Sequence, residues 1–233
     1  MNNKRFAIAS LIFILVLCST GVCQTTAKTT SLQATDDEQV LGRKVTLHET
    51  KNVQPWILFR DALNSARVPG GIVLMPECSH VAAAKNYSFA VSTLKLRDAL
   101  EAVTSLDDQS NWVLQNGTIN IVPKSGEPEL LKVKLAHFQL SKPGTSVSLA
   151  SGELFRTPEV TQALEHLQLK NNGTHLIIGG GSWRQEDISL DLHDVTVQEA
   201  LNAIATKHGY AVWSYSESHC NGKNEYSIDW VTR

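Results

Sequence analysis

The chain repeats one pattern of apolar and polar residues at a spacing of 101 positions, and this repeat limits its fold more than any other feature. Residues 88–103, SFAVSTLKLRDALEAV, align without a gap with residues 189–204, SLDLHDVTVQEALNAI. The same spacing places Trp112 on Trp213. Because the apolar positions agree through a strand pattern and then a helix pattern, the sequence predicts a duplicated unit.

Each copy changes its period at the same place. Apolar and polar residues alternate over 188–193, which is typical of a strand with one face on a core and the other in water. From Val197 the apolar residues recur every three or four positions, as in a short amphipathic helix, and Thr196 and Glu199 form a capping box at its start. Lys95 takes the place of that threonine in the first copy, so the first turn of its helix is expected to fray.

The remaining elements follow from shorter patterns. Each unit is expected to read strand, helix, strand, strand, helix, strand, strand, which is an α+β fold in two tandem copies. The leading strand, first helix, next strand and closing hairpin are expected at 44–48, 56–66, 71–75 and 112–122, and again at 132–140, 158–167, 175–178 and 210–231. The first hairpin turns at Asn116-Gly117, the strongest short hairpin signal, and the second is expected to have a longer loop through Asn221-Gly222.

The N-terminus has the composition of a secretory signal. Two basic residues precede an unbroken apolar run over residues 6–18, which is too short to span a bilayer. We expect a signal peptide at residues 1–23, removed after Cys23. A lipoprotein anchored at Cys23 is the alternative, although the valine before it is larger than the residue such signals prefer.

Composition divides the rest of the chain. Residues 24–43 are rich in Thr, Ser, Ala and Gln and lack periodicity, so they are predicted to form a flexible leader, with organised sequence from about residue 44. Two domains are predicted at 44–123 and 131–233. A linker at 124–130, which contains glycine and proline, separates them.

Charge and hydropathy argue against two classes of protein. The sequence has 21 Lys and Arg against 23 Asp and Glu, a formal net charge of −2, and therefore no basic field to hold a nucleic-acid backbone. No segment after the signal approaches the ~20 apolar residues of a transmembrane helix. We therefore expect an exported protein, periplasmic or secreted, that has no transmembrane segment and binds no nucleic acid.

The order of elements resembles the secretin and TonB short N-terminal domain (STN). The residues that match best are 188–204, a strand followed by a T-x-x-E-A-L-x-x-I helix, and the aromatic strand that starts at Tyr210. The resemblance covers each unit from its leading strand to its closing hairpin. It implies two tandem STN-like domains in an envelope protein linked to a secretin or TonB-type system. The second unit carries an insert, residues 141–156, that the family pattern lacks.

Two cysteines remain after the signal, Cys78 and Cys220. In an exported chain such a pair favours a disulfide, which would join the two units. Free or intermolecular thiols are an alternative. A zinc site that adds His80 and His219 is another, but neither pair has a CxxC spacing, and adjacent His219 and Cys220 would be awkward ligands for one ion.

No motif indicates a catalytic centre. The glycine run at 179–182 lacks a Walker lysine and precedes a strand, so we interpret it as a turn, and the sequence has neither a GxSxG elbow nor an HExxH motif. His193 beside Asp191 is interpreted as a solvated strand residue and His208 as a helix-end residue. We therefore expect no enzyme activity, no metal and no cofactor. A site that evolved later in one unit would lie in the loop at 217–220.

Aromatic residues gather in the second unit: Trp183, Trp213, Tyr215 and Trp230. Alternate spacing suits a platform for sugar or peptide, and it equally suits the inward face of a strand. We favour a core role and keep a binding surface of Trp183, Trp213, Tyr215 and His219 as the alternative.

Two classes of function fit these features. The first is an exported, non-catalytic protein–protein interaction or scaffold module of the cell envelope, which offers sheet edges or grooves to a protein partner that the sequence does not identify. The second is a small-ligand or glycan binder that uses the groove between the units, or more remotely a hydrolase there.

Overall fold

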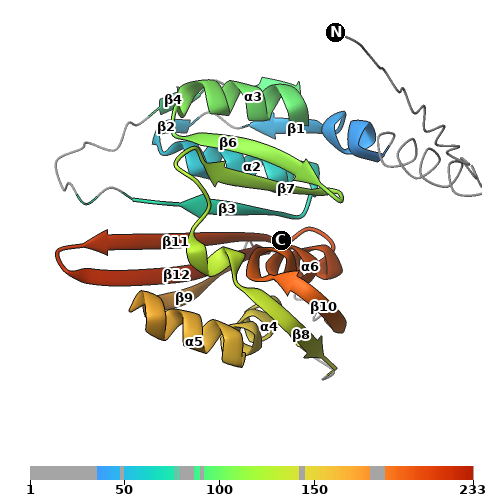
Figure 1. The fold of residues 1–233 in the computed structure, drawn as a ribbon. Coiled ribbons are helices and arrows are strands. Elements are labelled where there is room, and N and C mark those ends of the chain that lie inside the picture. The colour runs from blue at the N-terminus through green and yellow to red at the C-terminus, as the bar shows by residue number, and fades with distance from the viewer. Residues whose placement is uncertain are drawn as a thin grey trace, which may run out of the picture. The chain divides into compact units, whose positions relative to one another are not determined.

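The protein has a mixed α+β fold, as the sequence predicts, built on one six-stranded sheet (Figure 1). The computed structural model describes residues 36–47, 50–76, 78, 87–89, 92–141, 145–178 and 187–232. In spatial order the sheet contains β6 (Ser110–Gln115), β7 (Thr118–Pro123), β3 (Gly70–Leu74), β11 (Val212–Cys220), β12 (Lys223–Thr232) and β9 (Lys170–Ile178). Three two-stranded sheets pair β1 (Lys44–Leu47) with β5 (Ser92–Lys95), β8 (Lys134–Leu140) with β10 (Leu190–Thr196), and β2 (Thr50–Val53) with β4 (Tyr87–Phe89).

Amphipathic helices cover the six-stranded sheet. They are α2 (Pro55–Ala66), α3 (Leu96–Leu106), α4 (Val147–Leu154), α5 (Pro158–Leu167) and α6 (Val197–His208), with a 3-10 turn η1 (Glu129–Lys132). A short helical segment at 36–41 precedes β1 and buries Leu41, so the folded part begins ahead of the predicted start near residue 44. None of the helices in these described ranges is long and apolar enough to cross a membrane.

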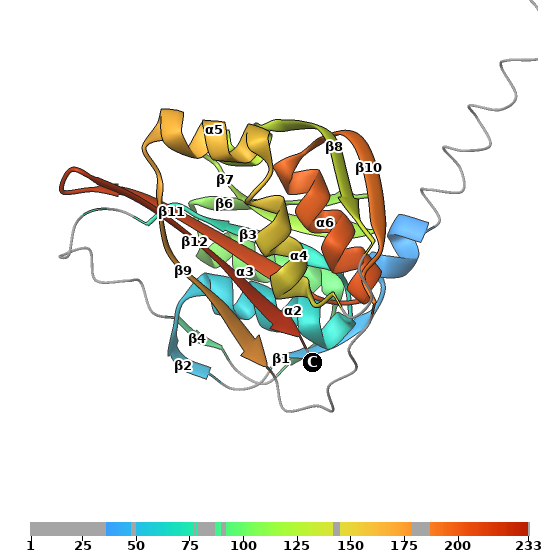
Figure 2. The same cartoon turned by 90° about the horizontal axis from the view of Figure 1, so that it is seen from below.

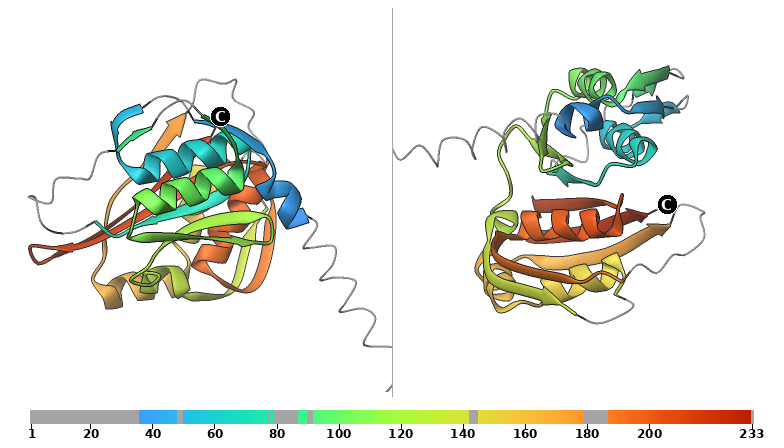
Figure 3. Two further views of the ribbon diagram at one scale, coloured as in Figure 1. Left: turned by 90° about the horizontal axis from the view of Figure 1, so that it is seen from above. Right: turned by 90° about the vertical axis from the view of Figure 1, so that its right-hand side faces the viewer.

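Two hydrophobic cores lie on opposite faces of the sheet. Successive side chains of a strand point to opposite faces, so Ile72 and Val212 enter the core beneath α2 and α3, whereas Val73 and Trp213 enter the core beneath α4 and α6. Figure 3, left, shows α2 and α3 in front of the sheet, and Figure 2, seen from the other side, shows α4 and α6 in front of it. Each face of the sheet therefore has its own layer of helices.

The two predicted units pair their strands alike, and they share a sheet. In the first, β1 pairs antiparallel with β5, β3 parallel with β7, and β7 antiparallel with β6. In the second, β8 pairs antiparallel with β10, β9 parallel with β12, and β12 antiparallel with β11. A parallel ladder between β3 and β11 joins the two sets of strands, which the sequence analysis did not foresee.

Two glycines allow β3 to pair with β11. Gly71 lies beside Trp213 in the register, and a Cβ on Gly71 would overlap the indole ring. A Cβ on Gly70 would overlap the carbonyl oxygen of Ile119 on the other neighbouring strand. The close approach of β3 to both neighbours therefore requires residues without side chains.

The two hairpins turn at the glycines that the sequence indicates. Asn116 and Gly117 have φ of 52° and 72°, and Asn221 and Gly222 have φ of 55° and 73°, so each hairpin has a two-residue turn. The prediction of a longer second loop is wrong, because β11 and β12 stay paired up to Cys220 and Lys223. Residues near this tip are polar, so the alternation of apolar and polar residues that predicts a strand is weak there.

Candidate functional site

The aromatic residues of the second hairpin belong to the core. Trp213, Tyr215 and Trp230 are each 0% exposed, because α4 and α6 cover this face of the sheet. The Nε1–H of Trp213 donates to Oδ1 of Asn202 at 3.0 Å, and that of Trp230 donates to Oγ of Ser151 at 3.1 Å. The alternative of an aromatic binding surface is therefore wrong for Trp213 and Tyr215.

Farther along β11 the same face becomes polar. Glu217 follows Tyr215 by two residues and is only 5% exposed, which is unusual for a carboxylate. The Tyr215 hydroxyl donates a hydrogen bond to Oε2 of Glu217, and Nε2 of His219 lies 2.8 Å from Oε1. Both oxygens of the Glu217 side chain thus have protein partners, as buried polar atoms require.

The protonation of this cluster follows from its burial and hydrogen bonds. Burial raises the pKa of the Tyr215 phenol, and its hydrogen bond to Glu217 raises it further, so the phenol stays a donor. Hydrogen bonds to Glu217 and then to Asn224 raise the pKa of the His219 imidazole above its usual value. The His219 side chain is 46% exposed, so the raised pKa extends toward higher pH the range over which the cluster presents a cationic edge to solvent.

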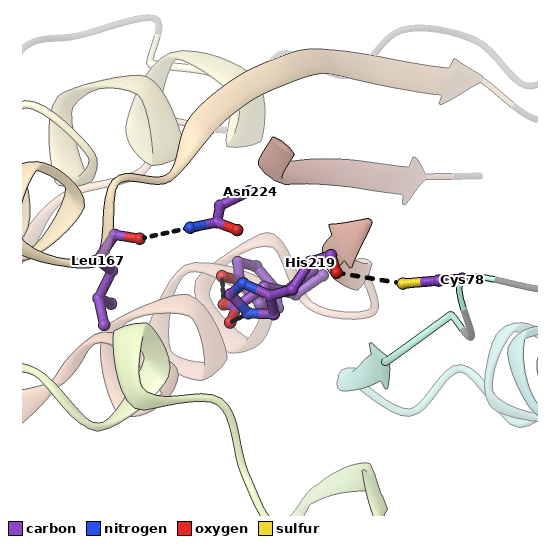
Figure 4. A network of polar contacts seen from close by, with 6 residues as sticks. Cys78, Leu167, His219 and Asn224 are labelled. Atoms are coloured by element: carbon purple, nitrogen blue, oxygen red, sulfur yellow. Dashed lines mark hydrogen bonds and ion pairs between the residues drawn. The ribbon is translucent and has the colours of Figure 1, made fainter. Parts of the chain in front are cut away.

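Two links hold the hairpin tip that carries this cluster. The sulfur atoms of Cys78 and Cys220 lie at disulfide-bonding distance, with Cα atoms 5.1 Å apart, as predicted. Cys78 Sγ also lies 3.1 Å from the carbonyl oxygen of His219 (Figure 4). On the other side, Nδ2 of Asn224 donates to the carbonyl oxygen of Leu167 at the end of α5, at 3.2 Å (Figure 4).

A groove opens beside the turn of the same hairpin. It has a volume of about 790 Å³ and lies between α5 and the start of β12. Its walls include Thr161, Leu164, Glu165, Gln168, Lys223 and Glu225. Polar and apolar groups therefore mix along its walls.

A second polar cluster, on β8 and β10, was missed by the sequence analysis. Asp191 and His193 have side chains 61% and 64% exposed, as expected for the outward face of a strand. The residue directly opposite His193 is His137 on β8, which the sequence analysis did not single out. The alternation of apolar and polar residues predicts both strands, but it does not predict the register that places the two histidines opposite each other.

Part of the predicted site lies outside the residues that the structure describes. Trp183, His80, the glycine run at 179–182, and the predicted signal and leader up to residue 35 lie outside them. No family model, curated protein or solved structure matches this chain. The resemblance to STN domains stays a prediction from sequence pattern and element order.

Proposed function

We propose that this chain is an exported, non-catalytic protein–protein interaction or scaffold module of the cell envelope, and that a partner adds a strand to the edge of its sheet at β6. The secretory-type N-terminus and the cysteine pair at bonding distance support export. The observation that carries the binding role is the position of β6 at the edge of the six-stranded sheet.

The proposal includes two tandem STN-like units. Its support is the sequence repeat at a spacing of 101 residues together with the strand pairing, which is antiparallel, parallel and antiparallel at equivalent places in the two halves. Leu100 and Leu201, which the repeat aligns, are both fully buried in helices α3 and α6. In such a tandem, β3 and β11 meet inside the sheet and β6 and β9 form its ends.

The β6 edge has backbone groups available for a partner. Within the described residues β6 pairs only with β7. The ladder begins with Ser110 opposite Pro123 and ends with Gln115 opposite Thr118. Alternate N–H and C=O groups of an edge strand point away from its one neighbour and are not used in that ladder. An added strand would pair with these groups.

The side chains of β6 fit strand addition. Trp112 and Leu114 are half-buried against the core beneath α3, which fixes the strand, whereas Asn111, Val113 and Gln115 are exposed. Val113 is 47% exposed, one of few large apolar side chains so exposed in the described part of the chain. An apolar residue on a partner strand would cover Val113 and remove it from water.

Site-specific photocrosslinking in the native host tests this proposal. A photoreactive amino acid replaces Val113 in one version of the full chain and Leu149, which is 61% exposed on α4, in a matched control. We expect one discrete adduct from position 113 and none from position 149. The double variant Asn111→Lys with Gln115→Lys should abolish the adduct, because charges on an edge strand oppose strand addition.

The same experiment separates the alternatives. An adduct of equal strength from both positions, or one that persists in the double lysine variant, would contradict recognition at β6. If a glycan or other small ligand is the partner, position 113 gives no protein adduct, and ligand binding should instead respond to Gln168→Ala or Lys223→Ala in the groove beside α5.

A further inference from the structure

The strands β8 and β10 bring together two histidines and an aspartate that the interaction module does not use. Figures 1 and 2 show these two strands side by side next to α6. Their antiparallel register places His137 directly opposite His193, and Asp191 lies two residues before His193 on β10. All three side chains are therefore on one face of the strand pair.

The polar atoms of these residues converge on a single point. Oδ1 of Asp191 lies 2.8 Å from Nε2 of His137 and 3.2 Å from Nε2 of His193. The two imidazole rings stack with centroids 4.4 Å apart and planes 4° from parallel, and both direct Nε2 toward the same carboxylate oxygen. One ligand atom from each residue falls within 4.8 Å of the others.

The backbone beneath this cluster is well supported, and its outer side is open. On the inner face of the same strands, Leu192 pairs with Phe138 and Leu190 with Leu140, and these residues pack in the core beneath α4 and α6. The side chains of His137, Asp191 and His193 are 48%, 61% and 64% exposed. A bound ion would thus have three protein ligands on one side and solvent on the other.

We propose that His137, Asp191 and His193 form an open three-ligand site for a borderline divalent transition metal, with Zn²⁺ as the reference ion. Two imidazoles and one carboxylate suit Zn²⁺, Ni²⁺ or Cu²⁺, whereas Mg²⁺ and Ca²⁺ prefer sites made of oxygen ligands. Bonds of about 2.0–2.1 Å to a tetrahedral Zn²⁺ separate neighbouring ligand atoms by about 3.3–3.4 Å. The two N–O distances in the cluster, 2.8 and 3.2 Å, need only a small expansion to reach that value.

Metal binding requires a free lone pair on each Nε2 atom. A hydrogen bond from an imidazole Nε2 to the Asp191 carboxylate in the metal-free form would require the ring proton on that nitrogen. When Zn²⁺ binds, Nε2 of each neutral ring donates its lone pair to the ion and the remaining ring proton resides on Nδ1. Asp191 changes from hydrogen-bond acceptor to ligand, and the remaining coordination position holds water or a group from a binding partner.

Zn²⁺ titration of the full chain, purified without a polyhistidine tag, tests the proposal. We expect one Zn²⁺ per chain, and at least about tenfold weaker binding in each of His137→Ala, His193→Ala and Asp191→Asn. The control is His166→Ala, which removes an exposed histidine from α5 and should leave the affinity unchanged. Because the three residues are exposed, their replacement should leave the circular dichroism spectrum and the urea unfolding midpoint of the metal-free protein unchanged.

A spectroscopic readout identifies the ligands directly. Electron paramagnetic resonance of the Cu²⁺ form should show coupling to two imidazole nitrogens in the wild type and to one in His137→Ala or His193→Ala. His219→Ala removes a half-exposed histidine whose carboxylate partner is Glu217 and should keep both couplings. Failure to bind Zn²⁺ with a Kd below about 100 μM would overturn the proposal, and so would undiminished binding after both His137 and His193 are replaced.

Discussion

At the scale of single residues, Gly71 sets how closely β3 approaches β11. Trp213, which fills the space above Gly71, is fully buried and donates a hydrogen bond to Asn202, so it has no room to move. We expect Gly71→Ala to reduce the free energy of unfolding by about 1–3 kcal/mol, the usual cost of overpacking. Urea unfolding measures this loss.

The matched control for that substitution is another glycine. Gly152 lies inside α4 with no atom within 4 Å of an added Cβ, so Gly152→Ala should stabilise the protein by about 0.5–1 kcal/mol through helix propensity. Equal effects of the two substitutions would show that Gly71 is not in close contact with Trp213.

His219 predicts a dependence of stability on pH. Its hydrogen bond to Glu217 raises the folded-state pKa above the unfolded value of about 6.5. The protonated ring therefore stabilises the fold fully below about pH 6.5, and this contribution is lost as pH rises through the higher folded-state pKa. His219→Gln should reduce the free energy of unfolding more at about pH 5.5 than at about pH 9. High salt should make this difference between the two pH values smaller, because the ring is half-exposed and its charge is screened. A difference between wild type and variant that stays constant with pH would contradict this assignment.

At the scale of elements, the two aligned helices differ at the N-cap residue that precedes each of them. The Thr196 side chain accepts a hydrogen bond from the Glu199 N–H at 3.1 Å, and Glu199 accepts one from the Thr196 N–H at 2.7 Å. At the equivalent position, Lys95 makes no side-chain cap before α3. We expect Thr196→Ala to destabilise by about 1 kcal/mol and Lys95→Ser to stabilise by up to about 1 kcal/mol.

Urea unfolding and amide exchange measure these two effects together. Exchange in the first turn of α3 should slow in Lys95→Ser, because the cap satisfies an N–H group that is otherwise without a helical partner. A loss of stability in Lys95→Ser would mean that the lysine contributes more through its long side chain than a cap does.

Elements with local signals could be predicted from the sequence, and contacts between distant segments could not. The capping box before α6, the alternation in β10 and the Asn116-Gly117 turn each depend on neighbouring residues. The glycines of β3 indicate a close neighbour but do not say that it is Trp213.

The candidate site shows the same limit. Cysteine count and export led to the pair Cys78 and Cys220. Burial of Glu217 and the position of His137 opposite His193 follow from packing and register, which a single sequence does not reveal.

At the scale of the whole molecule, the two halves exchange contacts across the sheet. Helix α6 packs on β3 and helix α2 on β11, and Val212 of the second half lies in the core of the first. The ladder between β3 and β11 and these packing contacts mean that neither half keeps its core complete when the other unfolds. We infer that Asp36–Arg233, one compact unit, is stabilised as a whole.

The link between Cys78 and Cys220 adds a constraint on the unfolded chain, because it spans a sequence separation of 142 residues. For a loop of that length the chain-entropy model gives a stabilisation of about 5 kcal/mol, and structure that persists in the unfolded chain makes the stabilisation smaller. We therefore expect Cys78→Ser with Cys220→Ser to reduce the free energy of unfolding by about 3–5 kcal/mol. Reductant should lower the unfolding midpoint of the wild type and leave that of the double variant unchanged.

Alkylation and mass spectrometry of protein from an oxidising compartment supply the independent check: neither Cys78 nor Cys220 should react before reduction, and both should react after it. Two reactive thiols in the native, unreduced protein would show that the cysteines are close but not bonded, and the expected loss of stability would then vanish.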